Sequence, residues 1–219
     1  MRSTIARVVG FAAAALVALA VMGPASASPM VIPLQPQPFS AFSAAGPAAA
    51  EMVSAYSYTN TFTGDVTFAG DIYSQAYALS GGSYLYLYEV DNHGPSALEV
   101  FAVAPMYSLM SAGYLTSGEP AWFLAGGQAP LGVTYDVAPA TPVVSFGYPS
   151  VVGAYLPAGG HTAVLYVVSP YAPVVGEGYV IDSGVAVAQV VRPLPEPATL
   201  ALMTFGGLAL ARVRRRRAG

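Results

Sequence analysis

The 219-residue chain contains no cysteine and no lysine. Without cysteine it can form neither a disulfide framework nor a thiolate metal site, and it has no cysteine nucleophile. Its positive charge comes from eight arginines, none of which lies between residues 28 and 191. They are Arg2, Arg7, Arg192, Arg212, Arg214, Arg215, Arg216 and Arg217. A domain in the central stretch must therefore be held together by its apolar core alone.

The same central stretch is strongly acidic. Of the eleven Asp and Glu residues in the chain, only Glu196 lies outside it, which leaves ten inside. Its formal charge is thus −10, whereas the whole chain carries −3. A surface without basic side chains cannot neutralise phosphates, so the composition excludes nucleic acid as a partner.

Short runs rich in Val, Tyr, Phe and Thr dominate the chain from about residue 50 onward. Most are bounded by Gly, Pro, Asn or Asp, and no convincing amphipathic helix separates them. The runs are residues 53–59, 66–73, 84–90, 98–103, 133–137, 143–148, 163–168 and 179–191. This pattern predicts an all-β fold class, an antiparallel β-sandwich of about eight strands in one domain over residues 50–191.

Residues 28–49 have a different composition, with four prolines in their first eleven positions. Proline removes a backbone donor and favours extended chain that does not pair. We therefore expect residues 28–49 to form a Pro-rich linker.

The N-terminus has the layout of a secretory signal peptide. Arg2 and Arg7 form a positive region, and an apolar run from Val8 to Met22 follows it. Ala25 and Ala27 then form an A-x-A cleavage site. We expect residues 1–27 to be removed after export through the Sec machinery.

The C-terminal segment, residues 192–219, combines three features. Pro195, Glu196 and Pro197 form a rigid acidic tripeptide, which precedes an apolar run over residues 198–211. Positive charge then closes the chain at Arg212, Arg214, Arg215, Arg216 and Arg217. Such an order predicts a short transmembrane helix with the arginines on the cytoplasmic side.

This ending resembles the PEP-CTERM sorting signal of Gram-negative bacteria, the sequence read by exosortases. The resemblance implies recognition of Pro195, Glu196 and Pro197 by an exosortase, which cuts near them. It also implies transient anchoring in the inner membrane, followed by release to the cell surface or the extracellular space. The Tyr-rich stretch near residue 84 and the Gly159-Gly160 stretch are loosely similar to the body of such proteins.

The most regular strand pattern is found at residues 83–90. Tyr84, Tyr86 and Tyr88 share one face there, and Leu85 and Leu87 share the other. Residues 91–95 read as a turn, so the strand is expected to form a hairpin with residues 97–103. The leucine face is expected to point inward. The tyrosines then either fill the core or its rim, or form an exposed face that binds sugar rings such as those of an exopolysaccharide.

Signals for catalysis or metal binding are weak. The two histidines, His93 and His161, lie in predicted turns, and no Gly-x-Ser-x-Gly motif occurs. Asp91 with His93 supplies only two zinc ligands, where three or four are needed. Calcium could use oxygens of Glu89, Asp91 and Asn92, or of Asp65 with Asp71. Ordinary solvated turn carboxylates explain these residues better, so no metal, cofactor or catalytic residue is assigned.

Three functions remain open at this point. The favoured one is an exported, non-enzymatic protein of the cell surface or extracellular matrix, sorted by an exosortase. The second is a module that binds exopolysaccharide through Tyr84, Tyr86 and Tyr88. The third is a secreted hydrolase with a pair of carboxylates that the spacing does not reveal.

Overall fold

The computed structural model describes residues 29–137, 141–148 and 155–194. Over these residues the chain is all-β, with thirteen strands and one three-residue 3-10 helix, η1 (Phe39–Ala41). The strands are β1 (Met30–Ile32), β2 (Gln35–Pro38), β3 (Ala44–Pro47), β4 (Met52–Thr59), β5 (Val66–Leu79), β6 (Tyr84–Asn92), β7 (Val100–Ala104), β8 (Ser111–Ser117), β9 (Gly132–Asp136), β10 (Val143–Gly147), β11 (Leu165–Ser169), β12 (Pro173–Ile181) and β13 (Val185–Pro193). Within the described ranges no helix is long and apolar enough to cross a membrane.

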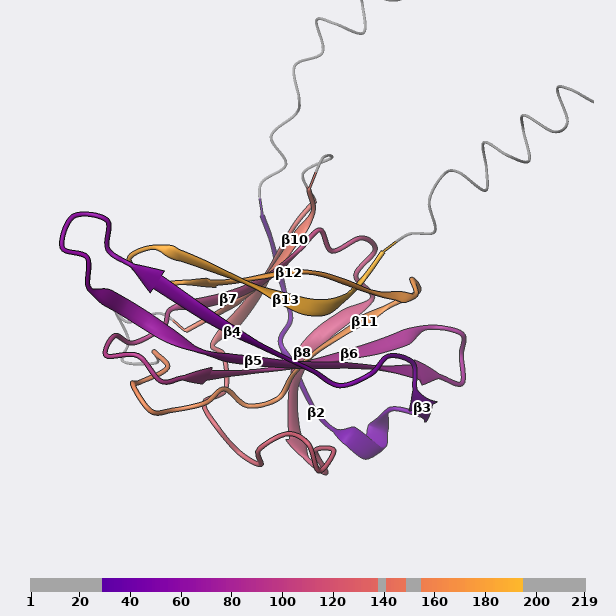
Figure 1. Cartoon of the computed structure of the whole chain (residues 1–219). Helices are drawn as coiled ribbons and strands as arrows, with labels where there is room; N and C mark the ends of the chain where they lie inside the picture. The colour runs from indigo at the N-terminus through magenta and orange to yellow at the C-terminus, as the bar shows by residue number, and fades with distance from the viewer. Residues whose placement is uncertain (1–28, 138–140, 149–154, 195–219) are drawn as a thin grey trace, which may run out of the picture.

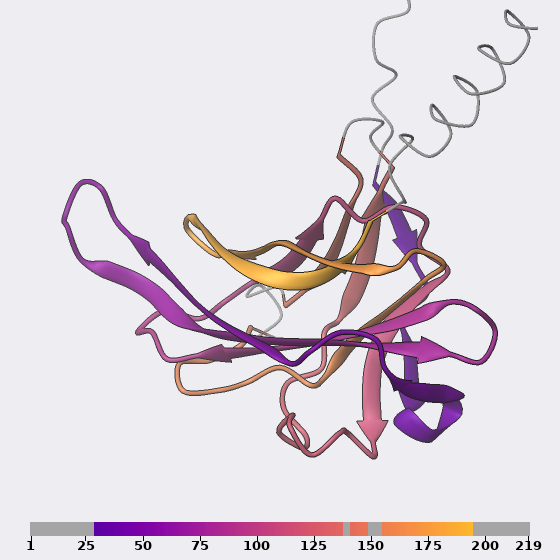
Figure 2. The same ribbon diagram turned by 45° about the vertical axis from the view of Figure 1, so that its right-hand side comes forward.

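The strands form two sheets that face each other (Figures 1 and 2). One sheet has six strands in the order β1-β9-β10-β7-β12-β13. The other has the order β2-β8-β11-β6-β5-β3, with β4 also paired to β5. All pairings are antiparallel except that of β2 with β8, which is parallel. The expected all-β class is confirmed, although the described residues contain more strands than the eight predicted.

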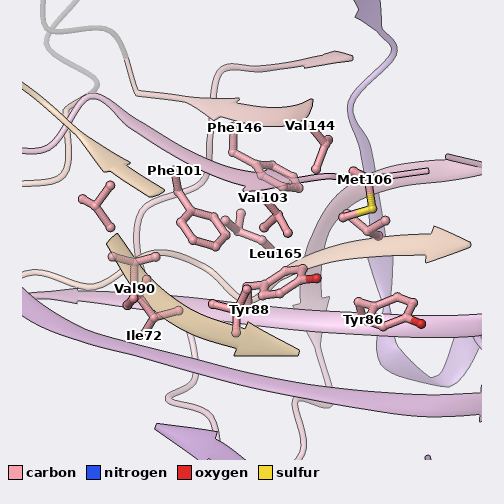
Figure 3. Close-up of a cluster of buried hydrophobic side chains, with 14 of the residues drawn as sticks. Ile72, Tyr86, Tyr88, Val90, Phe101, Val103, Met106, Val144, Phe146 and Leu165 are labelled. Carbon is pink, nitrogen blue, oxygen red and sulfur yellow. The ribbon is translucent and has the colours of Figure 1, made fainter. Parts of the chain in front are cut away.

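The main core lies between the two sheets. Tyr86 and Tyr88 on β6 point into it and are 0% exposed. Figure 3 shows Phe101 and Phe146 facing them from the six-stranded sheet, and the ring centroids of Tyr88 and Phe101 are 5.5 Å apart. Burying a large apolar side chain contributes about 1.5–3 kcal/mol. This layer therefore supplies the stability that disulfides give to many exported proteins.

A second apolar cluster covers the outer face of the seven-stranded sheet. Leu85 and Leu87, which alternate with the tyrosines on β6, are 0% exposed in this cluster. Phe123, from the segment between β8 and β9, packs against the same cluster, as does Phe39 of η1. Strand β6 is thus buried on both faces, which makes it the structural centre of the described chain.

The predicted linker over residues 28–49 is wrong for residues 30–47. Strand β1 pairs with β9, β2 with β8, and β3 with β5. The prolines are accommodated because β2 and β3 are the two outer strands of the sheet order. Pro36, Pro38 and Pro47 thus lie where a missing amide donor is tolerated. The folded unit begins near Met30 and not at residue 50.

The predicted hairpin between residues 84–90 and 97–103 is also wrong. Strand β6 pairs with β5 and β11, whereas β7 pairs with β10 and β12 in the other sheet. The polar segment after Asp91 therefore carries the chain from one sheet to the other. Strand β6 instead forms a hairpin with β5, over the turn at Gly82.

The run at residues 179–191 divides into two strands. Strands β12 and β13 form a long antiparallel hairpin, with Ile181 opposite Val185. The turn between them contains Gly184, where a Cβ atom would lie 2.1 Å from the Tyr58 ring. A side chain at this position would displace that ring, so the close approach requires glycine.

Both ends of the described chain leave the six-stranded sheet at the same end. Five successive antiparallel pairings separate β1 from β13, so these two edge strands run in opposite directions. The start of β1 and the end of β13 accordingly lie on the same side of the molecule in Figures 1 and 2.

Two tyrosines on β6 provide a matched test of the core. The Tyr86 hydroxyl donates to the Tyr171 carbonyl oxygen at 2.5 Å, whereas the buried Tyr88 hydroxyl has no hydrogen-bond partner. We expect Tyr86→Phe to lower the free energy of unfolding by about 1 kcal/mol, because one hydrogen bond is lost. We expect Tyr88→Phe to leave it unchanged or raise it by about 1–2 kcal/mol, because an unsatisfied polar atom is removed. Urea unfolding measures both values, and a larger loss for Tyr88→Phe would contradict this account of the core.

Candidate functional site

Several residues singled out from the sequence lie outside the described residues. They are Ala25 and Ala27 of the signal cleavage site, the Pro195, Glu196 and Pro197 tripeptide, and the arginines Arg212, Arg214, Arg215, Arg216 and Arg217. Their roles stay predictions.

Of the two interpretations of Tyr84, Tyr86 and Tyr88, the structure favours side chains that fill the core or its rim, and an exposed ligand face does not form. Tyr86 and Tyr88 are fully buried between the sheets, and Tyr84 is half-buried beside the same cluster. The expectation that the leucine face alone points inward fails because the outer face of β6 has its own apolar cover. No row of exposed tyrosine rings is therefore available on β6 for stacking against sugars.

Polar side chains instead gather on the outer face of β6, beyond Leu87. Glu89 and Asp91 share that face because side chains alternate along a strand. The segment before β11 runs beside the end of β6 here, and Asp91 lies opposite His161 in an isolated antiparallel bridge. One ligand atom from each of Glu89, Asp91 and His161 lies within 4.8 Å of the others. We call these three residues the β6 cluster.

Backbone hydrogen bonds hold the two segments of the β6 cluster in register. The Asn92 amide donates to the Gly160 carbonyl oxygen at 2.9 Å, and the Thr162 amide donates to the Val90 carbonyl oxygen at 3.0 Å. The Val90 amide in turn donates to the Thr162 hydroxyl at 3.0 Å. These bonds flank His161 and place its ring beside β6.

A third segment, between β8 and β9, closes over Glu89. The Leu124 amide donates to Oε2 of Glu89 at 2.8 Å. Further along, the Gln128 amide donates to the His161 carbonyl oxygen at 2.8 Å. Gly127 permits this approach, since its φ is +86° and a Cβ atom there would lie 2.4 Å from the Thr162 carbonyl oxygen.

The oxygen sets that the sequence offered to calcium do not assemble as sets, although Glu89 and Asp91 lie together. Asn92 is buried on the face opposite to Asp91, where its amide nitrogen donates to carbonyl oxygens of Ser96, Leu156 and Pro157. Asp65 precedes β5 and Asp71 lies six residues further on, which separates them by about 20 Å along an extended chain. Nor is Glu89 a solvated turn carboxylate, because it is only 1% exposed.

His93 lies at the solvent edge of the same region. Its side chain is 58% exposed, with Nδ1 3.7 Å from Oδ2 of Asp71 and Nε2 3.8 Å from Oδ2 of Asp91. It therefore borders the β6 cluster on the side where Asp91 reaches solvent. The sequence places His93 two positions after Asp91, so spacing marks it as a possible metal ligand. His161 lies 70 positions after Asp91, and only its place after two glycines distinguishes it in the sequence.

The electrostatics of the β6 cluster are dominated by burial. Burial raises the pKa of the Glu89 carboxyl to about 7; the Leu124 amide opposes this rise, and the charges of Asp91 and Glu119 add to it. Burial also raises the pKa of Asp91, which His161 and His93 lower and Asp71 raises. Each carboxylate thus resists ionisation unless positive charge is supplied.

The charge on Glu89 should make stability depend on pH. Its folded pKa of about 7 exceeds the ordinary 4.5, so the folded chain holds this proton more tightly. Stability is therefore expected to fall as the pH rises through this interval. Glu89→Gln removes this ionisation. With free metal ions removed by a chelator, the substitution should raise the free energy of unfolding at pH 8 by about 1–3 kcal/mol; the lower value allows for solvent screening.

Urea unfolding between pH 4.5 and 8 tests this prediction. Glu51→Gln, which removes one exposed carboxylate far along the chain from β6, is the matched control and should keep the parent's pH dependence. Equal pH profiles for Glu89→Gln and the parent would show that Glu89 is not a buried, reluctantly ionised group.

The chain matches no family model, no curated protein and no solved structure. Its function is therefore inferred from its own residues.

Proposed function

We propose that the chain is an exported, non-enzymatic protein of the cell surface or extracellular matrix, sorted by an exosortase at its C-terminal tripeptide. One observation carries this proposal. A signal-peptide layout at one end coincides with a Pro-Glu-Pro tripeptide, an apolar run and an arginine block at the other. The four features together are typical of the PEP-CTERM class, which the C-terminal segment resembles.

The physical properties of the C-terminal segment suit a temporary tether. Residues 198–211 would span about 21 Å as a helix, whereas the hydrocarbon core is about 30 Å thick. The arginines must then snorkel or the bilayer must thin, so the anchor is held weakly. Pro195 and Pro197 keep the tripeptide extended, which leaves Glu196 accessible to a membrane protease just outside the bilayer.

The arrangement of the described chain supports such a tether. Because β1 starts and β13 ends at the same end of the six-stranded sheet, a signal peptide and a C-terminal anchor can both engage one membrane surface. Neither connection then needs to cross the folded unit. The uncompensated negative charge of residues 28–191 favours repulsion from an anionic membrane once the tether is cut.

The Glu196→Ala substitution tests recognition of the tripeptide in the native host. It removes the only charge that the tripeptide offers to a protease, so release should slow sharply. Full-length protein with its arginine tail should accumulate in the inner-membrane fraction. Cell fractionation with C-terminal mass spectrometry measures this distribution.

Glu51→Ala is the matched control, because it makes the same chemical change at an exposed site in the folded unit. It should be processed like the parent. An intact arginine tail on surface-located parent protein would refute sorting by cleavage, and normal release of Glu196→Ala would refute recognition through Glu196.

A further inference from the structure

We propose that Glu89, Asp91 and His161 bind one divalent transition-metal ion, with Zn²⁺ as the best fit. This site goes beyond the proposed sorting function and is independent of it. It joins β6 to the segment at residues 155–162, so its expected role is to stabilise the folded unit.

The geometry of the β6 cluster is the first argument. Three metal-ligating side chains from two distant parts of the chain place one ligand atom each within 4.8 Å of one another. Zinc binds nitrogen and oxygen ligands at about 2.0–2.2 Å, so two of its ligand atoms can lie up to roughly 4 Å apart. Small side-chain rotations therefore bring all three ligand atoms onto one ion.

Unpartnered polar atoms are the second, independent argument. Glu89 is 1% exposed, and its Oε1 is buried without a hydrogen-bond partner. Asp91 Oδ1 and His161 Nδ1 are likewise buried and unpartnered. Buried polar atoms without partners are rare and costly, because they give up their bonds to water and gain nothing in return. Three such atoms from the three clustered residues indicate that a ligand supplies the missing bonds.

Charge balance is the third argument. Among the described residues the single arginine, Arg192, lies on β13 in the other sheet, where its Nη1 donates to the Pro105 carbonyl oxygen. The chain has no lysine, so no basic side chain of the described residues other than the nearby histidines can offset Glu89 and Asp91. A divalent cation supplies two positive charges at the place where two carboxylates meet.

The surrounding contacts hold the ligands before an ion arrives. The Leu124 amide fixes Oε2 of Glu89 and leaves Oε1 free. The Tyr56 hydroxyl donates to the Asp91 carbonyl oxygen at 2.7 Å, which fixes the backbone of the second ligand. Such outer contacts orient metal ligands and raise affinity. The Asp91 side chain is 15% exposed, so solvent reaches the cluster from that side.

The donor set selects the class of ion. One imidazole with two carboxylates suits Zn²⁺ and its first-row neighbours, whereas Ca²⁺ takes six to eight oxygens, as a rule. The only nearby amide side chain on β6, that of Asn92, is turned away and used in backbone contacts. Three protein ligands leave at least one position for water, so the site is expected to be open on its solvent side.

The test uses the full-length chain in mild detergent, produced without a polyhistidine tag and stripped with chelator. Equilibrium dialysis against Zn²⁺, followed by elemental analysis, should find one ion per chain. Zinc at a hundredfold excess over Kd should raise the unfolding midpoint by roughly 5–10 °C, since it binds the folded state alone. Co²⁺ should bind the same site and give visible absorption bands that Zn²⁺ displaces.

Three variants assign the ligands. Glu89→Gln keeps the size of the side chain but removes the carboxylate ligand, and His161→Ala removes the imidazole ligand. Each substitution should weaken Zn²⁺ binding by at least about 100-fold. His93→Ala is the matched control, an exposed histidine beside Asp91 that should leave the affinity within about threefold of the parent. Glu89→Gln is expected to fold at least as well as the parent, so its loss of binding cannot be ascribed to unfolding.

Several outcomes would overturn the site. Absence of stoichiometric Zn²⁺ binding at micromolar concentrations would do so, as would unchanged binding in both Glu89→Gln and His161→Ala. Loss of binding in His93→Ala alone would place the ion at the exposed Asp71–His93 edge instead. Binding of Ca²⁺ as tight as that of Zn²⁺ would refute the assignment to a transition-metal ion.

Discussion

The apolar layer between the two sheets is the interaction on which the rest of this structure depends. No disulfide supports the fold, so the contacts of Tyr88 with Phe101, and of their neighbours, must hold the six-stranded sheet against the seven-stranded one. Strand β6 contributes Tyr86 and Tyr88 to this layer and Leu85 and Leu87 to the outer cluster. Because both faces of β6 are buried, packing on both sides fixes the strand that carries Glu89 and Asp91.

Charge is the second constraint. A domain with ten carboxylates and no lysine or arginine between positions 28 and 191 cannot build internal ion pairs of the usual kind. Most of its carboxylates can remain in water, but Glu89 is enclosed by β6 and the segment that carries Leu124. Protons, histidines or an added cation are then the available counter-charges. A divalent cation at this position would supply the counter-charge that no arginine or lysine of the described residues provides.

Much of the strand content could be predicted, because β-branched and aromatic runs bounded by turn residues mark strands locally. Strand β8 was missed, since its sequence from Ser111 to Ser117 opens with small residues and contains no run of β-branched residues. Its Gly113 lies so close to Gln35 and the Tyr166 ring that a Cβ atom would clash with both. The Pro-rich segment was predicted to be an unpaired linker because proline has no backbone amide donor. Edge strands tolerate the missing donor, and β2 and β3 are edge strands. Pairing was misread at Asp91–Pro95, where a polar turn signal does not say which sheet the chain enters next.

The order of residues by itself determined the all-β class and the acidic and cysteine-free character of the domain, because these follow from composition and local periodicity. Only the tertiary structure decided which face of β6 is covered, because burial depends on what other segments bring to each side. It also decided that His161 meets Asp91 across a gap of 70 positions, since that contact arises from the pairing of distant segments and not from spacing. Local patterns describe what a strand can bury, and the packing of distant strands decides what it does bury.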